Sequence, residues 1–168
     1  MSQQIRKEAI AHPERFTGQA LTQCDVQKAI DAVLQKIDGM MERFGDRFPF
    51  CSSTNGKYEI IDNIEWTTGF WTGMLHLAYE YSGKEKYRTL ADTHVQSFKE
   101  RIDRKGADVR HHDLGFLYTL SCVASYKLTK NQTARQAALE AADFLATRYL
   151  PQAGIIQAWG DLSDPEQQ

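Results

Sequence analysis

The chain has 168 residues, of which 42% are hydrophobic and 25% charged, the composition of one ordinary folded unit with a sizeable core. Its net charge of −2 and isoelectric point near 6.2 argue against a general nucleic-acid binder or membrane-surface binder. Residues 1–20, an N-terminal extension, carry no apolar run, so we read neither a signal peptide nor a membrane span there and expect a cytoplasmic protein.

The cysteines are odd in number and far apart in the chain. Cys24, Cys51 and Cys122 fit reduced thiols better than a disulfide framework or a CxxC metal site. Free cysteine usually behaves as a small buried hydrophobe, so we expect all three to be structural.

Apolar residues recur at helical spacing along almost the whole chain. The pattern predicts five helices, at about residues 26–44, 66–83, 87–105, 113–128 and 132–150, the last stopped by Pro151. Residues 45–63 are polar and rich in turn formers, so we expect a loop there, and no segment alternates convincingly enough to predict a strand. Helices joined by short turns predict an all-α protein of stacked helical hairpins.

The last residues form a polar stretch rich in aspartate, proline and glutamate, which favour the first turn of a helix. We therefore expect another helix to follow residues 161–168 and the chain to be truncated there. A disordered terminal tail is the alternative.

Two imidazoles and a carboxylate occupy one turn before the fourth predicted helix, at His111, His112 and Asp113. Asp113 could simply cap the helix by accepting backbone N–H groups. The histidines favour a chemical site, because imidazoles titrate near neutral pH and can donate to the carboxylate, holding it in one orientation.

All three tryptophans lie beside predicted loops. Flat aromatic side chains cover the apolar C–H faces of sugar rings, so tryptophan together with aspartate and histidine suits a carbohydrate. Trp71 is in register with the apolar face of the second helix and is at least as well explained by packing, whereas Trp66 and Trp159 are better candidates. Helix starts of successive hairpins converge on one rim, which would bring Trp66, Asp113 and Trp159 together.

Three motifs, EWTTGFWTGML at residues 65–75, HHDLGF at 111–116 and GIIQAW at 154–159, resemble the unsaturated glucuronyl hydrolases, glycoside hydrolase family 88. Their order and spacing match the family from about residue 26 onward, and the motifs look like those of the streptococcal members. The resemblance implies an (α/α)6 barrel, of which residues 1–168 would be the N-terminal portion with about the first five helices.

The resemblance also implies a reaction. The family's substrate is an oligosaccharide left by a polysaccharide lyase, here a glycosaminoglycan fragment, with a 4,5-unsaturated uronic acid at its non-reducing end. A carboxylic acid protonates C4, water attacks C5, and the hemiketal rearranges to release the next sugar. No cofactor and no metal are expected, since adjacent histidines rarely share one ion.

By the same resemblance, Asp113 is the first of two essential aspartates and binds ring hydroxyls while tuning its partner. The second falls beyond Gln168, and neither Asp161 nor Asp164 matches it. His112, Trp159 and one of Trp66 or Trp71 match substrate-contacting positions, and we favour Trp66.

The sequence leaves two other functions open. The related unsaturated rhamnogalacturonyl hydrolases act on pectin fragments, and the intact HHDLGF and tryptophan motifs argue against them. A chain with one carboxyl of a pair could also be a non-catalytic carbohydrate-binding module. We expect the 168 residues alone to be inactive, with apolar faces left uncovered. A homo-oligomer stays open, because neither the residues nor the resemblance gives the oligomeric state.

Overall fold

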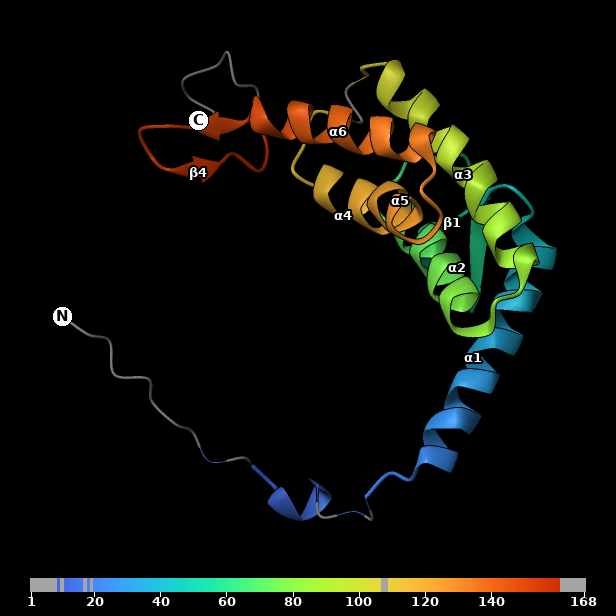
Figure 1. The fold of residues 1–168 in the computed structure, drawn as a ribbon. Coiled ribbons are helices and arrows are strands. Elements are labelled where there is room, and N and C mark those ends of the chain that lie inside the picture. The colour runs from blue at the N-terminus through green and yellow to red at the C-terminus, as the bar shows by residue number, and fades with distance from the viewer. Residues whose placement is uncertain (1–8, 10, 17, 19, 107–108, 161–168) are drawn as a thin grey trace. The chain divides into compact units, whose positions relative to one another are not determined.

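The computed structural model describes residues 9, 11–16, 18, 20–106 and 109–160, so residues 161–168, where a helix start was expected, lie outside it (Figure 1). The chain divides into two compact units, Met1–Leu34 and Gln35–Gln168. The first unit contains a short 3-10 helix, η1 (Pro13–Phe16), and the beginning of helix α1 (Gln23–Phe44).

A reciprocal pair of hydrogen bonds starts α1. Thr22 Oγ1 accepts the Asp25 N–H at 3.2 Å, and Asp25 Oδ2 accepts the Thr22 N–H at 3.0 Å. This capping box satisfies backbone donors that have no partner inside the helix. The first predicted helix is confirmed.

Strands β1 (Phe48–Thr54) and β2 (Lys57–Ile61) form an antiparallel hairpin where a loop was predicted. The loop prediction was wrong because Asn55 and Gly56 both adopt positive φ, at 50° and 71°, which is the hairpin turn whose twist matches paired strands. A register shift between Pro49 and Ser53 bends β1, and most of β2 is exposed, so neither strand shows a clean alternation of apolar and polar residues.

Helices α2 (Thr68–Ser82), α3 (Glu85–Asp103) and α6 (Gln132–Ala146) confirm the second, third and fifth predicted helices. α3 packs against both α2 and α6. α2 ends at Gly83, whose left-handed φ of 67° lets its N–H reach the Tyr79 carbonyl at 2.8 Å. α2 and α3, joined at Gly83, form a helical hairpin of the kind that the sequence predicts (Figure 1). α6 instead runs in the same direction as α3, since Asn131 bonds to Asp92 and Lys99 to Glu140.

The fourth predicted helix is present but not uniform. It consists of α4 (Leu114–Tyr118), the π-helical turn η3 (Thr119–Val123) and α5 (Ala124–Thr129). Within it, the Ser121 hydroxyl donates to the Leu117 carbonyl at 2.5 Å. A π turn leaves no mark on apolar spacing over so short a run, which is why the sequence predicted one regular helix.

The fifth helix is shorter than predicted. It ends at Ala146, and Tyr149–Leu150 (β3) instead pairs antiparallel with Ile155–Ile156 (β4). The turn between them begins at Pro151 and contains Gly154 at a φ of 67°. The residues that were expected to finish a helix therefore form a second small hairpin.

α2 approaches α4 and the following turn η3 closely at two glycines. A Cβ placed on Gly69 would lie 2.6 Å from the Leu117 carbonyl oxygen, and one on Gly73 would lie 3.2 Å from the Leu120 Cβ. Only glycine allows backbone to meet backbone at the first position. The start of α2 is therefore packed directly against the backbone of α4 at Phe116 and Leu117.

Large side chains from α2, α3 and α4 fill the core, where Trp71, Phe98 and Leu117 are almost completely buried. Tyr118 donates its hydroxyl to the Phe98 carbonyl at 2.9 Å. On another face of α2, four side chains spaced by three or four residues are between 36% and 65% exposed: Phe70, Met74, Leu77 and Tyr81. The expected uncovered apolar face is present there.

All three cysteines are free, but only Cys122 is buried, so the prediction of three buried thiols was wrong for Cys24 and Cys51. Burial raises the pKa of Cys122 to about 12. Cys24 lies in the exposed first turn of α1 and Cys51 in the bent part of β1, where no core covers them. Of the helices in the described part of the chain, none combines the length and apolar character needed to cross a membrane.

Two histidines are buried in the core. His94 Nδ1 lies 3.0 Å from the Thr72 hydroxyl, and His76 Nε2 lies 2.9 Å from the Ser121 carbonyl oxygen. Burial lowers the pKa of His94 to about 4, and Asp46 opposes this shift. Burial also lowers the pKa of His76, so both rings are neutral near pH 7.

We predict that Gly69→Ala destabilises the fold by about 1–3 kcal/mol, because the new methyl group meets the Leu117 backbone, which cannot rotate away. Urea unfolding of the two proteins measures the difference. Gly39→Ala is the matched control: Gly39 is exposed within α1 with nothing within 4 Å of the added Cβ, so helix propensity alone should raise stability slightly. Equal effects of the two changes would contradict the close packing.

We predict that stability falls as the pH drops from about 6.5 to about 4. In this window the unfolded chain protonates His94, whereas the folded chain keeps the ring neutral, so folding is favoured above the window and loses up to about 3 kcal/mol across it. The unfolding free energy measured against pH gives the slope. His94→Asn should reduce the slope to the part that His76 contributes, and an unchanged slope would show that His94 does not carry the dependence.

Candidate active site

Asp113 occupies the turn that leads into α4, immediately before the first helical residue. The turn closes when the Gly115 N–H donates to the His112 carbonyl at 3.2 Å, and α4 begins when the Leu117 N–H donates to the Asp113 carbonyl at 3.0 Å. The Asp113 side chain makes no capping hydrogen bond, although the residue is only 5% exposed. The capping interpretation is therefore wrong, and the carboxyl group faces the histidines.

The Asp113 carboxyl lies between two imidazoles. His111 Nδ1 is 3.3 Å from Oδ2, and His112 Nε2 is 3.2 Å from Oδ1. The side chain of His111 is 15% exposed and that of His112 is 36% exposed, so solvent or a ligand reaches the pair mainly along His112. The two rings flank the carboxyl, and the prediction that they hold it in one orientation stays a prediction.

The proton positions follow from what each ring nitrogen faces. His112 Nδ1 lies 3.1 Å from the Ala158 carbonyl oxygen, which can only accept, so we infer that Nδ1 carries a hydrogen. His111 Nδ1 accepts the Asp113 N–H at 3.2 Å. His112 Nε2 is then the ring nitrogen that faces Asp113 Oδ1, at 3.2 Å.

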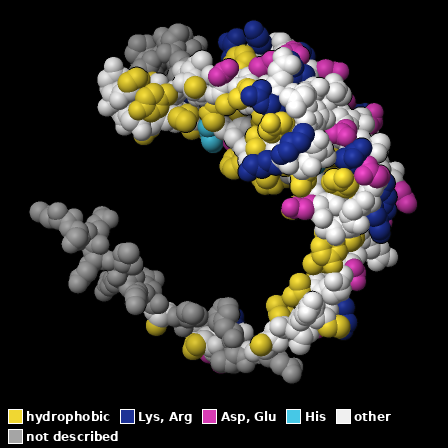
Figure 2. Space-filling view, viewed as in Figure 1, with side chains coloured by type: hydrophobic (Ala, Val, Ile, Leu, Met, Phe, Trp, Pro, Cys, Tyr) yellow, Lys and Arg dark blue, Asp and Glu magenta, His cyan; other side chains and the backbone are white. Residues whose placement is uncertain are grey.

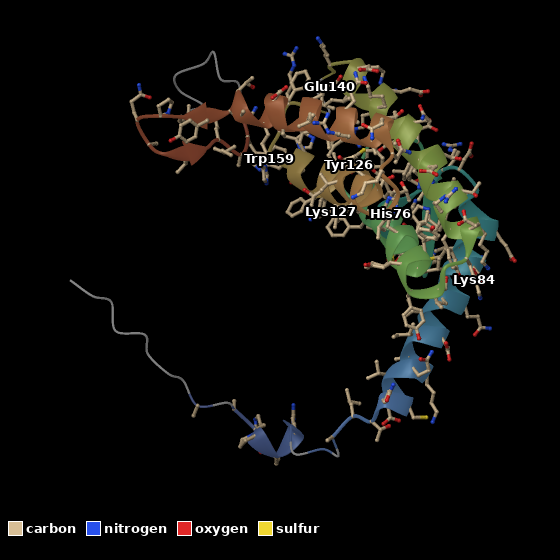
Figure 3. All side chains as sticks on the ribbon, in the orientation of Figure 1. His76, Lys84, Tyr126, Lys127, Glu140 and Trp159 are labelled. Atoms are coloured by element: carbon tan, nitrogen blue, oxygen red, sulfur yellow. The ribbon has the colours of Figure 1, made fainter. Side chains whose placement is uncertain are left out.

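Trp159 packs against both histidine rings from the loop after β4. Its ring stacks on His111 with centroids 5.6 Å apart, and it meets His112 edge-on at 4.9 Å. Figure 3 shows Trp159 beside the start of α4, and in the same view Figure 2 shows histidine atoms bordered by hydrophobic side chains. Trp159 is 61% exposed, so much of its ring remains available to a ligand.

The second tryptophan of the site comes from the turn before α2. Trp66 is 44% exposed and contacts Phe70 and Phe116 at centroid distances of 6.4 Å and 6.3 Å. Phe116 is in α4, three residues after Asp113, so Trp66 contacts the helix that follows the Asp113 turn. The convergence of Trp66, Asp113 and Trp159 stays a prediction.

Trp71 does not belong to this surface. It is 1% exposed and packs edge-on against Phe44 at 6.2 Å, so its candidacy as a sugar-contacting residue was wrong. Its position in the apolar stripe of α2 was the stronger signal.

Several contributors were missed from the sequence. Arg101 is fully buried and donates to the carbonyls of Glu65 at 2.9 Å and Ile64 at 3.0 Å, which holds the turn before Trp66. Phe70 and Phe116 extend the aromatic surface. The spacing of Gly69 and Gly73 is the one sequence signal that indicates how closely α2 meets α4.

A cavity of about 680 Å³ lies elsewhere, between the β1–β2 hairpin and α3. Polar side chains line it, among them Asp62, Asn63 and Gln96, and it shares no residue with the Asp113 turn. The Asp113 site therefore lies outside this cavity. Among the residues that the structure describes, no three His, Cys, Asp or Glu side chains are grouped as metal ligands.

A carboxyl flanked by imidazoles, with exposed tryptophan faces nearby, suits the hydroxyl groups and the apolar C–H faces of a sugar. Residues 36–167 match Glycosyl Hydrolase Family 88, and the chain belongs to this family.

Curated relatives support this assignment. The chain is 47% identical over 163 residues to an unsaturated chondroitin disaccharide hydrolase of Streptococcus pyogenes serotype M1, covering 96% of this chain and 41% of the relative. It is 49% identical over 140 residues to an unsaturated glucuronyl hydrolase of Bacillus sp. strain GL1, covering 83% and 37%. The chain thus spans well under half the length of the relatives that it matches.

Solved structures agree with the fold. The crystal structure of unsaturated glucuronyl hydrolase from Streptococcus agalactiae matches with a TM-score of 0.90 and 41% identity, covering 98% of this chain and 42% of that one. A mutant of the same enzyme complexed with dGlcA-GalNAc6S matches with a TM-score of 0.81, at 40% identity, over 88% of this chain and 39% of that one. The expected (α/α)6 fold class is confirmed.

Proposed function

We propose that the protein containing this chain removes the 4,5-unsaturated uronic acid from the non-reducing end of glycosaminoglycan fragments. The observation that carries the proposal is the Asp113 carboxyl held between two imidazoles at 3.3 Å and 3.2 Å, with Trp159 stacked beside them, in a member of this family. The relatives named for unsaturated chondroitin disaccharide add support for the substrate class.

The proposed chemistry is the addition of water across the C4=C5 bond of the unsaturated sugar. C4 receives a proton from a carboxylic acid, C5 receives the oxygen of water, and the hemiketal at C5 opens to release the next sugar. In this scheme Asp113 binds ring hydroxyls through its fixed carboxyl oxygens, while a second aspartate, which the family resemblance places after Gln168, transfers the protons. His112 and the exposed tryptophans Trp66 and Trp159 contact the sugar.

The orientation of His112 fits this assignment of roles. Because His112 Nδ1 is bound to the Ala158 carbonyl at 3.1 Å, Nε2 faces Asp113 Oδ1 at 3.2 Å. This contact orients the Asp113 carboxyl in the proposed site. A pair of carboxyl groups in different protonation states is what glycoside chemistry near neutral pH requires.

We predict that Asp113→Asn lowers the turnover of an unsaturated chondroitin disaccharide about a thousandfold while most of the affinity remains, because the amide keeps the shape of the side chain but lacks the carboxylate charge and its second acceptor oxygen. The protein expressed from its complete natural reading frame is incubated with the disaccharide, and loss of the near-ultraviolet absorbance of the conjugated C4=C5 bond is followed.

The matched control is Asp143→Asn, the same change on the exposed surface of α6, which should keep the unsubstituted rate. No absorbance loss with the unsubstituted protein would contradict the proposal. An unsaturated rhamnogalacturonyl substrate would then distinguish a pectin-directed enzyme from a carbohydrate-binding module that has no turnover.

We predict that Trp66→Ala and Trp159→Ala each weaken disaccharide binding about tenfold, because each removes an exposed aromatic face. Binding is measured by calorimetry in the Asp113→Asn background, where the substrate is not consumed. Trp71→Phe is the matched control: it should lower stability without changing the affinity, since Trp71 is buried in the core. An equal loss of affinity for all three changes would contradict the assignment of Trp66 and Trp159.

A further inference from the structure

Arg148 lies between the end of α6 and β3 and is only 4% exposed. Its guanidinium binds three backbone carbonyls: Nη1 donates to Arg110 at 2.6 Å, Nε to Gln157 at 2.8 Å, and Nη2 to Gly160 at 3.2 Å. The planar guanidinium has donors on three sides and can hold three acceptors in one fixed arrangement, which a lysine ammonium cannot reproduce.

The three acceptors belong to the two segments that build the site. Arg110 immediately precedes His111, whereas Gln157 and Gly160 flank Ala158 and Trp159. The guanidinium therefore connects the backbone before the histidines to the backbone on both sides of the tryptophan. The same segments meet again where the His112 N–H and Nδ1 approach the Ala158 carbonyl at 3.3 Å and 3.1 Å.

Holding the small β3–β4 hairpin together does not require this guanidinium. The hairpin has its own backbone pairing, Tyr149 with Ile156 and Leu150 with Ile155, and the Gln157 N–H donates to the Arg148 carbonyl at 2.9 Å. Burying a cation is costly unless its hydrogen bonds are satisfied, and here the satisfied bonds extend beyond the hairpin to Arg110.

We propose that Arg148 is a positioning residue for the Asp113 site. By fixing the backbone around Ala158 against Arg110, it holds the carbonyl that keeps the hydrogen on His112 Nδ1, and so determines which nitrogen faces Asp113. It also holds Trp159 against both imidazole rings. The catalytic consequence rests on the proposed hydration activity, whereas the link between the two segments does not.

The test is the substitution Arg148→Lys, which replaces the guanidinium by a single ammonium group, in the protein expressed from its natural reading frame. We expect kcat for the unsaturated chondroitin disaccharide to fall by about tenfold to a hundredfold, because small displacements of reacting groups are costly, while KM changes by less than about threefold. Amide hydrogen exchange is measured on the same samples. Peptides covering residues 109–113 and 155–160 should exchange faster, and a peptide from the middle of α3 should not.

The matched control is Gly154→Ala, which strains the tip of the same hairpin, where φ is 67°, and leaves the guanidinium bonds in place. We expect its kcat to equal that of the unsubstituted protein. An equal loss of kcat in both variants would mean that Arg148 acts only through hairpin stability, which overturns the proposal. Unchanged kcat in Arg148→Lys, or a lower kcat without faster exchange of the two peptides, also overturns it.

In two further cases, amide hydrogen exchange alone tests the role of Arg148. If the unsubstituted protein does not consume the disaccharide, the proposed function fails, and faster exchange of both peptides in Arg148→Lys still supports the link between the segments. If Arg148→Lys does not fold, the unsubstituted protein decides: the amides of His112 and Gln157 should be protected and open together as one unit. Independent opening of the two amides overturns the proposal.

Discussion

The contact between Gly69 and the Leu117 carbonyl limits where α4 can begin. Because backbone meets backbone there, α4 can move neither outward nor along α2 without losing contact or colliding. Leu117 is the fourth residue of α4, and Asp113 lies four residues, about one helical turn, before it. The contact with Gly69 is therefore one turn away from the carboxyl, which is 5% exposed yet still reached by His112.

Side chains supply the reactive groups of this site, but backbone carbonyls organise them. The Ala158 carbonyl determines the hydrogen on His112, and the carbonyls of Glu65 and Ile64 receive Arg101 just before Trp66. Each of these bonds joins segments that are distant in the chain. Loops with little regular structure thus hold aromatic and charged groups in defined positions.

The sequence predicts the helices and the Asp113 turn well because both leave local signals. Helical spacing identified α2 and α3, and adjacent histidines next to Asp113 identified the turn. Elements that depend on distant partners were missed. β3 forms a strand because it pairs with Ile155–Ile156, which follow it in the chain. For the β1–β2 hairpin, the sequence signal was the Asn55–Gly56 turn and not an alternation of apolar and polar residues in the strands. Burial distinguished Trp71 from Trp66, and burial is a property of the assembled core.

The acceptors of Arg148 have a consequence for how such a site changes during evolution. All three are main-chain oxygens, so the side chains at positions 110, 157 and 160 can vary without altering the bonds. An arginine paired with a glutamate can be exchanged together with its partner, but this one has no partner side chain whose change would compensate its loss. We expect the position to stay arginine while its neighbours diverge, with no correlated substitution to mark the contact.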